Sequence, residues 1–189
     1  DSNQTVKGSD ITDEQFNNAL KNSKVSRSVL ITQMRCVGGG LYIDYISNIF
    51  DCTQEAKLNL ENEYRFELFE DVDQMVKEIK NLDKKYGLCR NAAGYAWEWI
   101  SPNAINEIGC IHTLQGYDLN YCGVIFGEEI DYNPSTNKIE VDLDKFYDKY
   151  VKNGCDPDVV RTYIINSYKV ILTRGIKGTL VYACNKNMQ

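Results

Sequence analysis

The stretch that decides the fold is Gly109-Cys-Ile-His-Thr-Leu-Gln-Gly-Tyr-Asp-Leu-Asn-Tyr-Cys-Gly-Val-Ile-Phe-Gly127. Two apolar runs, residues 108–111 and 121–126, are typical of short buried strands. The loop between them is dense in hydrogen-bonding side chains. Loops at the ends of strands commonly carry the chemistry of an α/β protein, because the strands themselves are used for packing. The loop is therefore a candidate functional site. A hairpin or crossover loop that is polar only because it is exposed to solvent fits the spacing equally well.

Size and composition indicate one globular domain. The chain has 189 residues, of which 43% are hydrophobic and 25% are charged, and this is enough for one sizeable core. The sequence shows no internal repeat and no linker, so we expect residues 1–189 to form a single domain. The net charge of −6 argues against an extensively basic nucleic-acid surface, while a small local basic patch remains compatible with it.

Hydropathy and cysteine usage favour a cytoplasmic protein with no membrane partner. No apolar run approaches the roughly 20 residues that a transmembrane helix needs, and residues 1–4 do not resemble a signal peptide. The seven cysteines are widely spaced without a Cys-x-x-Cys pair, which favours free buried thiols over disulfides or a zinc site. A catalytic Cys–His pair would need His112, but no oxyanion motif accompanies it.

Strands and helices are expected to alternate along the chain. Apolar runs predict strands near residues 29–32, 65–69, 91–96, 108–111, 121–126 and 179–184. Helical spacing and capping residues predict helices at residues 9–22, 41–50, 70–87, 143–152 and from Asp156 onward. This alternation is typical of a three-layer α/β domain with a mainly parallel sheet and helices on both faces.

Three glycines, residues 38–40, precede the predicted helix at 41–50. A glycine-rich loop at a helix start can bind phosphate, but the Lys-Ser/Thr of a P-loop is missing here. We favour the structural interpretation, in which the glycines allow a tight turn into the helix.

Four short motifs stand in the order found in superfamily 1 helicases. Asp1-Ser-Asn-Gln4 resembles motif III, and Gln33-Met-Arg35 resembles the arginine segment of motif IV. Residues 109–118 resemble motif V, and Tyr168-Lys-Val-Ile-Leu-Thr-Arg174 resembles motif VI, which ends in an arginine. Each motif is weak alone, and the shared order and spacing make the resemblance specific.

The sequence resembles one bacterial family still more closely, the Schlafen group-3-like DNA/RNA helicase domain, whose members are P-loop ATPases. The resemblance is carried by Gln33-Met-Arg-Cys36, Ala93-Gly-Tyr-Ala-Trp-Glu-Trp99, residues 106–127 and Leu172-Thr-Arg-Gly-Ile-Lys-Gly-Thr179. It covers the chain nearly end to end and implies a RecA-like fold.

The sequence departs from the family pattern in two places. Nothing matches the Walker A lysine or the Walker B acid, which lie upstream of motif III in the family. We therefore expect this chain to be the second lobe of a two-lobed ATPase, with the N-terminal RecA-like lobe as its partner. Similar proteins also carry a longer polar segment between Trp99 and Asn106.

The resemblance implies that the chain supplies cations to an ATP site between two lobes. ATP with Mg²⁺ would be bound mainly by the first lobe, while arginines of the second stabilise charge that grows on the γ-phosphate. Arg174 and Arg35 match these arginines, and Gln4 would sense the γ-phosphate or orient water. The alternative is that each arginine pairs with a surface carboxylate, since acidic residues outnumber basic ones.

The same resemblance assigns roles in the motif V loop and nearby. Asp118 would accept a hydrogen bond from the ribose or orient the loop, and Gly116, beside Gln115, would let the loop approach phosphate. DNA or RNA backbone would be contacted by His112, Thr113 and Trp99. An ordinary core role is the alternative for His112 and for the aromatic residues.

Two further expectations can be checked against a structure and by assay. Arg35 and Arg174 should lie on one exposed edge near Gly116 and Asp118, and the chain alone should not hydrolyse ATP. A nucleotide-dependent switch ATPase in a defence or regulatory system, or a non-catalytic binding module, is the alternative to a helicase-like motor.

Overall fold

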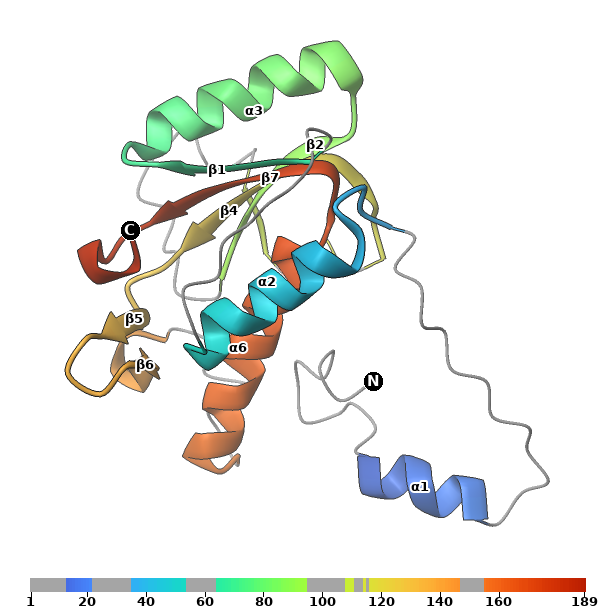
Figure 1. Ribbon diagram of the computed structural model, residues 1–189, viewed down its shortest axis with the longest axis vertical. Coiled ribbons are helices and arrows are strands. Elements are labelled where there is room, and N and C mark those ends of the chain that lie inside the picture. The colour runs from blue at the N-terminus through green and yellow to red at the C-terminus, as the bar shows by residue number, and fades with distance from the viewer. Residues whose placement is uncertain are drawn as a thin grey trace.

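The computed structural model describes residues 13–21, 35–53, 64–94, 108–110, 114, 116–146 and 155–189 (Figure 1). Its α-helices are α1 (Asp13–Lys21), α2 (Gly39–Asp51), α3 (Val72–Tyr86) and α6 (Pro157–Leu172). Its strands are β1 (Arg65–Phe69), β2 (Cys89–Ala93), β3 (Ile108–Cys110), β4 (Leu119–Phe126), β5 (Ile130–Asn133), β6 (Lys138–Val141) and β7 (Gly175–Ala183). Two short 3₁₀ turns, η2 (Leu143–Lys145) and η3 (Lys186–Met188), complete the described elements.

Five strands form one sheet in the order β1-β7-β4-β2-β3. Every neighbouring pair in this sheet is parallel, as the sequence predicted. Parallel strands need crossover connections, and helices α3 and α6 lie within two of them. The strand predicted at residues 29–32 lies outside the described residues.

Helices cover both faces of this sheet, as Figure 1 shows. Met75, Ile79 and Leu82 of α3 pack on one face against β2, β4 and β7. Helices α2 and α6 cover the other face through a larger cluster, in which Tyr42 and Ile164 are almost fully buried. The predicted three-layer α/β architecture, of the RecA-like type, is confirmed.

Local capping rules explain where α3 and α6 begin and end. The Asp71 carboxylate accepts a hydrogen bond from the Gln74 N–H (2.9 Å), and Gly87 ends α3 with a φ of 67°. Asp156 accepts from the Asp158 N–H (2.9 Å), and proline occupies the first residue of α6. The helix end predicted at residue 87 and the helix start predicted at Asp156 are confirmed.

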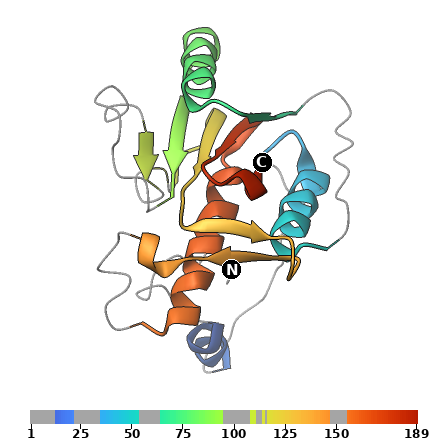
Figure 2. The ribbon, with the colours of Figure 1, turned by 90° about the vertical axis from the view of Figure 1, so that its left-hand side faces the viewer.

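Two predicted elements differ in the structure, and one strand had not been predicted. The helix predicted at 143–152 is only a 3₁₀ turn in its described part, because the Phe146 side chain is almost fully buried and its backbone is already extended. Strand β5 had not been predicted; it pairs with β6 as an antiparallel hairpin on the side of the sheet that α2 and α6 cover (Figure 2). Strand β7 begins at Gly175, four residues before the predicted start.

A buried hydroxyl–carboxyl pair fastens α6 to the carboxyl ends of the strands. The Tyr168 hydroxyl donates to Glu129 Oε1 (2.5 Å) and accepts from the Gly127 N–H (3.0 Å). Glu129 has no exposed surface, and this burial raises the pKa of its carboxyl group. Gly94 ends β2 beside the pair; a Cβ there would lie 2.1 Å from the Tyr168 hydroxyl oxygen, so only glycine fits.

None of the helices in the described part of the chain is long and apolar enough to span a membrane. Six of the cysteines are free thiols: Cys36, Cys52, Cys89, Cys122, Cys155 and Cys184.

Candidate functional site

Arg174 occupies the turn between α6 and β7, at the amino end of the sheet. Its N–H donates to the Ile171 carbonyl (3.1 Å), and its own carbonyl accepts from the Leu119 N–H (3.1 Å). Because Asp118 immediately precedes Leu119, the end of the motif V loop lies beside the arginine turn. Two segments that are distant in sequence are thus joined through the backbone.

Three buried hydroxyl groups hold the Arg174 turn in place. The Tyr42 hydroxyl and Thr179 Oγ1 both donate to the Leu172 carbonyl, at 2.8 and 3.0 Å. The Tyr64 hydroxyl lies 2.7 Å from Thr179 Oγ1 and donates to the Gly175 carbonyl at 3.3 Å. Burial raises the pKa of both tyrosines, which therefore remain neutral donors. The sequence analysis missed these positioning residues.

Arg35 reaches the same turn from the segment before α2. Its Nε lies 2.7 Å from Asp118 Oδ1, and both side chains are partly exposed. The Val37 N–H donates to the Ile176 carbonyl (2.9 Å), which attaches this segment to the start of β7. The structure therefore brings Arg35, Asp118 and Arg174 together, as the resemblance implied.

Arg174 is buried, which differs from the exposed edge that we expected. Only 6% of the residue is exposed, and within the described part of the chain its Nε has no hydrogen-bond partner. The reason is local: the turn lies between the buried end of α6 and the buried Gly175. A Cβ at Gly175 would lie 2.1 Å from the Gly178 carbonyl oxygen, so only glycine fits directly after Arg174.

Both burial and a neighbouring positive charge act on the Arg174 guanidinium. Burial lowers the pKa of its guanidinium, and the nearby positive charge of Arg35 lowers it further, while Asp118 and Cys122 act in the opposite direction. Burial raises the pKa of the Cys122 thiol to about 12, so this group is neutral and cannot serve as a counterion. Asp118, which forms the ion pair with Arg35, is thus the carboxylate that also acts on the Arg174 guanidinium among the described residues.

Gly116 has the backbone conformation of a residue that must be glycine. Its φ is 94°, in the region that other residues avoid, and a Cβ would meet no atom within 4 Å. The glycine is therefore needed for the path of the loop and not for close packing. Five of the other predicted site residues lie outside the described residues: Gln4, Gln115, His112, Thr113 and Trp99.

The three glycines at the start of α2 serve the turn into the helix, which agrees with the structural interpretation. Gly39 has a φ of 60°, and its N–H donates to the Cys36 carbonyl (3.0 Å). A Cβ at Gly38 would lie 2.8 Å from the Cβ of Tyr42, so a larger residue would displace the helix.

These features define an α/β domain of the RecA-like type. The chain belongs to the family described as Schlafen group 3, DNA/RNA helicase domain, which it matches over residues 1–103 and 100–185. The two matched ranges overlap at residues 100–103. This overlap lies in the segment between Trp99 and Asn106, where we expected similar proteins to be longer. Family membership places the chain, at this coarse level, among DNA/RNA helicase domains.

A curated relative extends this comparison to a eukaryote. The chain is 28% identical over 177 residues to the uncharacterized protein YPL245W of Saccharomyces cerevisiae. The match covers 74% of this chain and 38% of that protein, so the chain spans well under half of the relative's length. The comparisons lend no support to the bacterial origin that the resemblance had implied.

Proposed function

We propose that residues 1–189 act as the second RecA-like lobe of a helicase-like ATPase and supply Arg174 and Arg35 to an ATP site between two lobes. The observation that carries this proposal is the buried Arg174 guanidinium, whose Nε lacks a hydrogen-bond partner in the described structure. A buried cation in this condition costs stability unless a ligand compensates it. An anionic phosphate group would do so.

The residues present fit a nucleotide phosphate. Guanidinium groups stay charged and bind phosphate oxygens through a two-pronged fork, which suits both arginines. Asp118 pairs with Arg35 through Oδ1, and we infer that this carboxylate also accepts from the ribose. ATP, held with Mg²⁺ mainly by the first lobe, would supply the phosphoryl group that is transferred to water. Arg174 and Arg35 would stabilise the negative charge that develops on it.

The remaining assignments rest on the family resemblance. Gln4 would orient water or sense the γ-phosphate, and Gly116 and Gln115 would let the loop backbone approach phosphate. DNA or RNA would be contacted through His112, Thr113 and Trp99. We also infer that the protein acts in a reducing compartment such as the cytoplasm, which the free thiols support.

The test is ATP turnover of the full-length protein, measured as phosphate release with and without DNA or RNA. Arg174→Ala should lower kcat about 10³-fold, because it removes a cation that acts on the transition state. It should leave nucleic-acid binding largely intact. Arg161→Ala is the matched control, since Arg161 is an exposed arginine of α6 that pairs with Asp158 (2.7 Å). Wild-type turnover in Arg174→Ala would refute the proposal.

The Arg35–Asp118 ion pair supports a second candidate, a nucleotide-dependent switch or a non-catalytic module. Arg35 already has a carboxylate partner without any ligand, so the pair could simply tie the loop to the start of α2. Turnover that DNA or RNA stimulates strongly favours the motor. Basal turnover alone favours the switch, and the absence of turnover favours the binding module.

A further inference from the structure

Exposed apolar side chains gather at the end of the sheet where Arg174 lies. The described part of the chain exposes eight large apolar side chains, and five of them belong to segments at the amino ends of the strands. These five residues, which we call the apolar edge, are Val37 and Leu41 at the start of α2, Tyr86 and Leu88 before β2, and Tyr117 before β4. Clusters of exposed apolar side chains commonly mark a surface that another protein surface covers.

Backbone hydrogen bonds hold the segments of the apolar edge next to one another. The Asn120 N–H donates to the Leu88 carbonyl (2.9 Å), which joins the turn before β2 to the start of β4. The start of β4 is in turn bonded to the Arg174 carbonyl, as described above. The Val37 N–H donates to the Ile176 carbonyl (2.9 Å) at the start of β7. Because β7, β4 and β2 are neighbours in the sheet, the apolar edge borders the arginine turn.

Leu88 has a backbone conformation that leucine rarely adopts. Its φ is 49°, in the left-handed region, where glycine and asparagine are more usual. Its side chain is 61% exposed, so burial within the domain compensates little of this strain. Strained backbone of this kind is found mainly at functional sites. The strain and the exposure together indicate that Leu88 contacts another surface.

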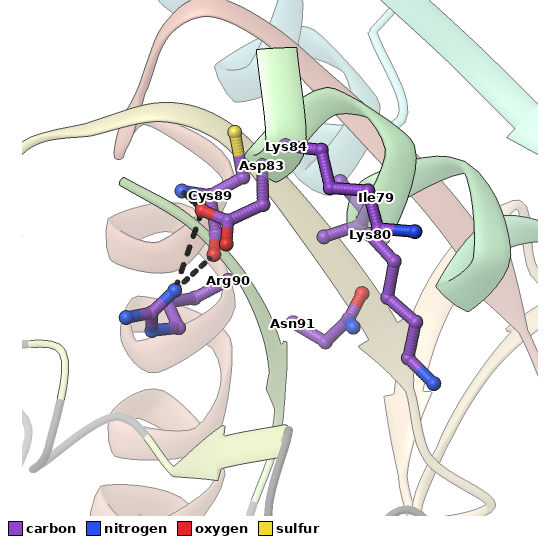
Figure 3. Close-up of a pocket in the computed structure, with 7 residues that line it drawn as sticks. All are labelled: Ile79, Lys80, Asp83, Lys84, Cys89, Arg90 and Asn91. Atoms are coloured by element: carbon purple, nitrogen blue, oxygen red, sulfur yellow. Dashed lines mark hydrogen bonds and ion pairs between the residues drawn. The ribbon is translucent and has the colours of Figure 1, made fainter. Parts of the chain in front are cut away.

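The turn that carries Leu88 is fixed from both sides. Asp83 accepts two hydrogen bonds, one at its carbonyl from the Gly87 N–H (2.8 Å) and one at Oδ1 from the Cys89 N–H (2.8 Å). Asp83 and Cys89 lie side by side in Figure 3, where they line a groove of about 410 Å³ between α3 and β2. From β4, Asn120 Nδ2 donates to the Gly87 carbonyl (3.1 Å). The turn is therefore ordered before a partner binds, which lowers the entropic cost of a contact.

We propose that the apolar edge is the contact surface for the first lobe and holds the two lobes together even when no nucleotide is bound, with Leu88 and Tyr117 as the main contacts. This inference rests on the proposed function, because the first lobe must approach this edge to share a phosphate group with Arg174. A nucleotide is too small to cover all five apolar side chains. Their burial against a protein surface is favourable with or without ATP.

The composition of the edge fits a protein interface. Such interfaces are enriched in aromatic residues and arginine. Tyr117 is 62% exposed and directly precedes Asp118, whose ion pair with Arg35 is partly exposed at the same edge. The yeast relative is long enough to include a further lobe, since the match covers 38% of that protein.

The proposal is tested by small-angle X-ray scattering of the full-length protein without nucleotide. Leu88→Asn/Tyr117→Ser should raise the radius of gyration, because the lobes separate. It should also raise the KM for ATP about tenfold or more, since only the closed fraction binds ATP between the lobes. The matched control is Leu68→Ser/Val159→Ser, which removes two exposed apolar side chains from β1 and α6, outside the apolar edge. Its radius of gyration and KM should equal those of the wild type.

A single substitution separates the lobe contact from folding. Asparagine adopts the left-handed conformation more readily than leucine does, so Leu88→Asn should fold like the wild type and give the same circular dichroism spectrum. A larger radius of gyration in this variant would therefore report the loss of the contact.

Two results would overturn the proposal. One is an unchanged radius of gyration and KM in Leu88→Asn/Tyr117→Ser. The other is a wild-type dimer that becomes a monomer in this variant, which would make a second copy of the chain the occupant. Arg174→Ala should keep the radius of gyration of the wild type while it loses turnover. A failure of the apolar edge is thus distinguishable from a failure of the proposed ATP site, which wild-type turnover in Arg174→Ala would show.

Discussion

Removing the Tyr168 hydroxyl should destabilise the protein strongly, because that hydroxyl serves two buried partners. In Tyr168→Phe, Glu129 Oε1 loses its donor (2.5 Å) and the Gly127 N–H loses its acceptor (3.0 Å). A buried polar group without a partner costs about 1–3 kcal/mol, so the two together should cost about 4 kcal/mol. Since Tyr168 is fully buried, water cannot readily replace the lost bonds.

The assay is thermal and urea unfolding followed by circular dichroism. For a chain of this length each kcal/mol lowers Tm by about 2–4 °C, so Tm should fall by roughly 12 °C. Typical stabilities of about 5–15 kcal/mol leave the variant folded at room temperature.

Tyr132→Phe provides the matched control for this experiment. The Tyr132 hydroxyl also donates one hydrogen bond, to Asn137 Oδ1 (2.8 Å), but on the exposed β5–β6 hairpin. Water can satisfy both groups there, so the loss should stay within about 0.5 kcal/mol. If Tyr168→Phe costs no more than this control, the hydroxyl does not satisfy the two buried partners as described.

Three further predictions concern Glu129, Thr179 and the chain alone. Burial raises the pKa of the Glu129 carboxyl group above its ordinary value of 4.5 in the folded protein. The stability that the protonated carboxyl group contributes is therefore complete below pH 4.5 and is lost as the pH rises through the folded pKa. Glu129→Gln should remove this loss of stability at higher pH. Urea midpoints of Glu129→Gln that vary with pH as those of the wild type do would contradict this prediction. Thr179→Val deletes the hydroxyl group beneath the Arg174 turn and should lower the free energy of unfolding by about 1–2 kcal/mol. It should also lower kcat more than it raises KM. An unchanged kcat would limit Thr179 to a structural role. The chain alone should not hydrolyse ATP, and micromolar affinity for ATP with Mg²⁺ by isothermal titration would contradict the two-lobed arrangement.

Local rules in the sequence predicted most of the fold. Apolar runs located all five described strands of the parallel sheet, and capping residues such as Asp156 marked helix ends, because these signals act between near neighbours. The start of β7 was missed because Gly175 and Gly178 interrupt its apolar pattern. Phe146 ended a predicted helix early, because burial in the core overrides the helical preference of its neighbours.

The candidate site depended on contacts that no local rule supplies. Motif resemblance pointed to Arg35, Asp118 and Arg174, and the structure adds their proximity and the burial of Arg174. The hydroxyl of Tyr42 bonds a carbonyl 130 positions away, so its role follows only from the folded chain.

The hydrogen bond from the Leu119 N–H to the Arg174 carbonyl joins the amino ends of β4 and β7 directly through their backbones. We expect a displacement at the end of the motif V loop, beside Asp118, to reach the arginine turn through this backbone hydrogen bond. If that loop holds nucleic acid and the arginine holds phosphate, the two binding equilibria are energetically coupled. Such coupling is reciprocal, so ATP would change the affinity for nucleic acid by the same factor by which nucleic acid changes the affinity for ATP.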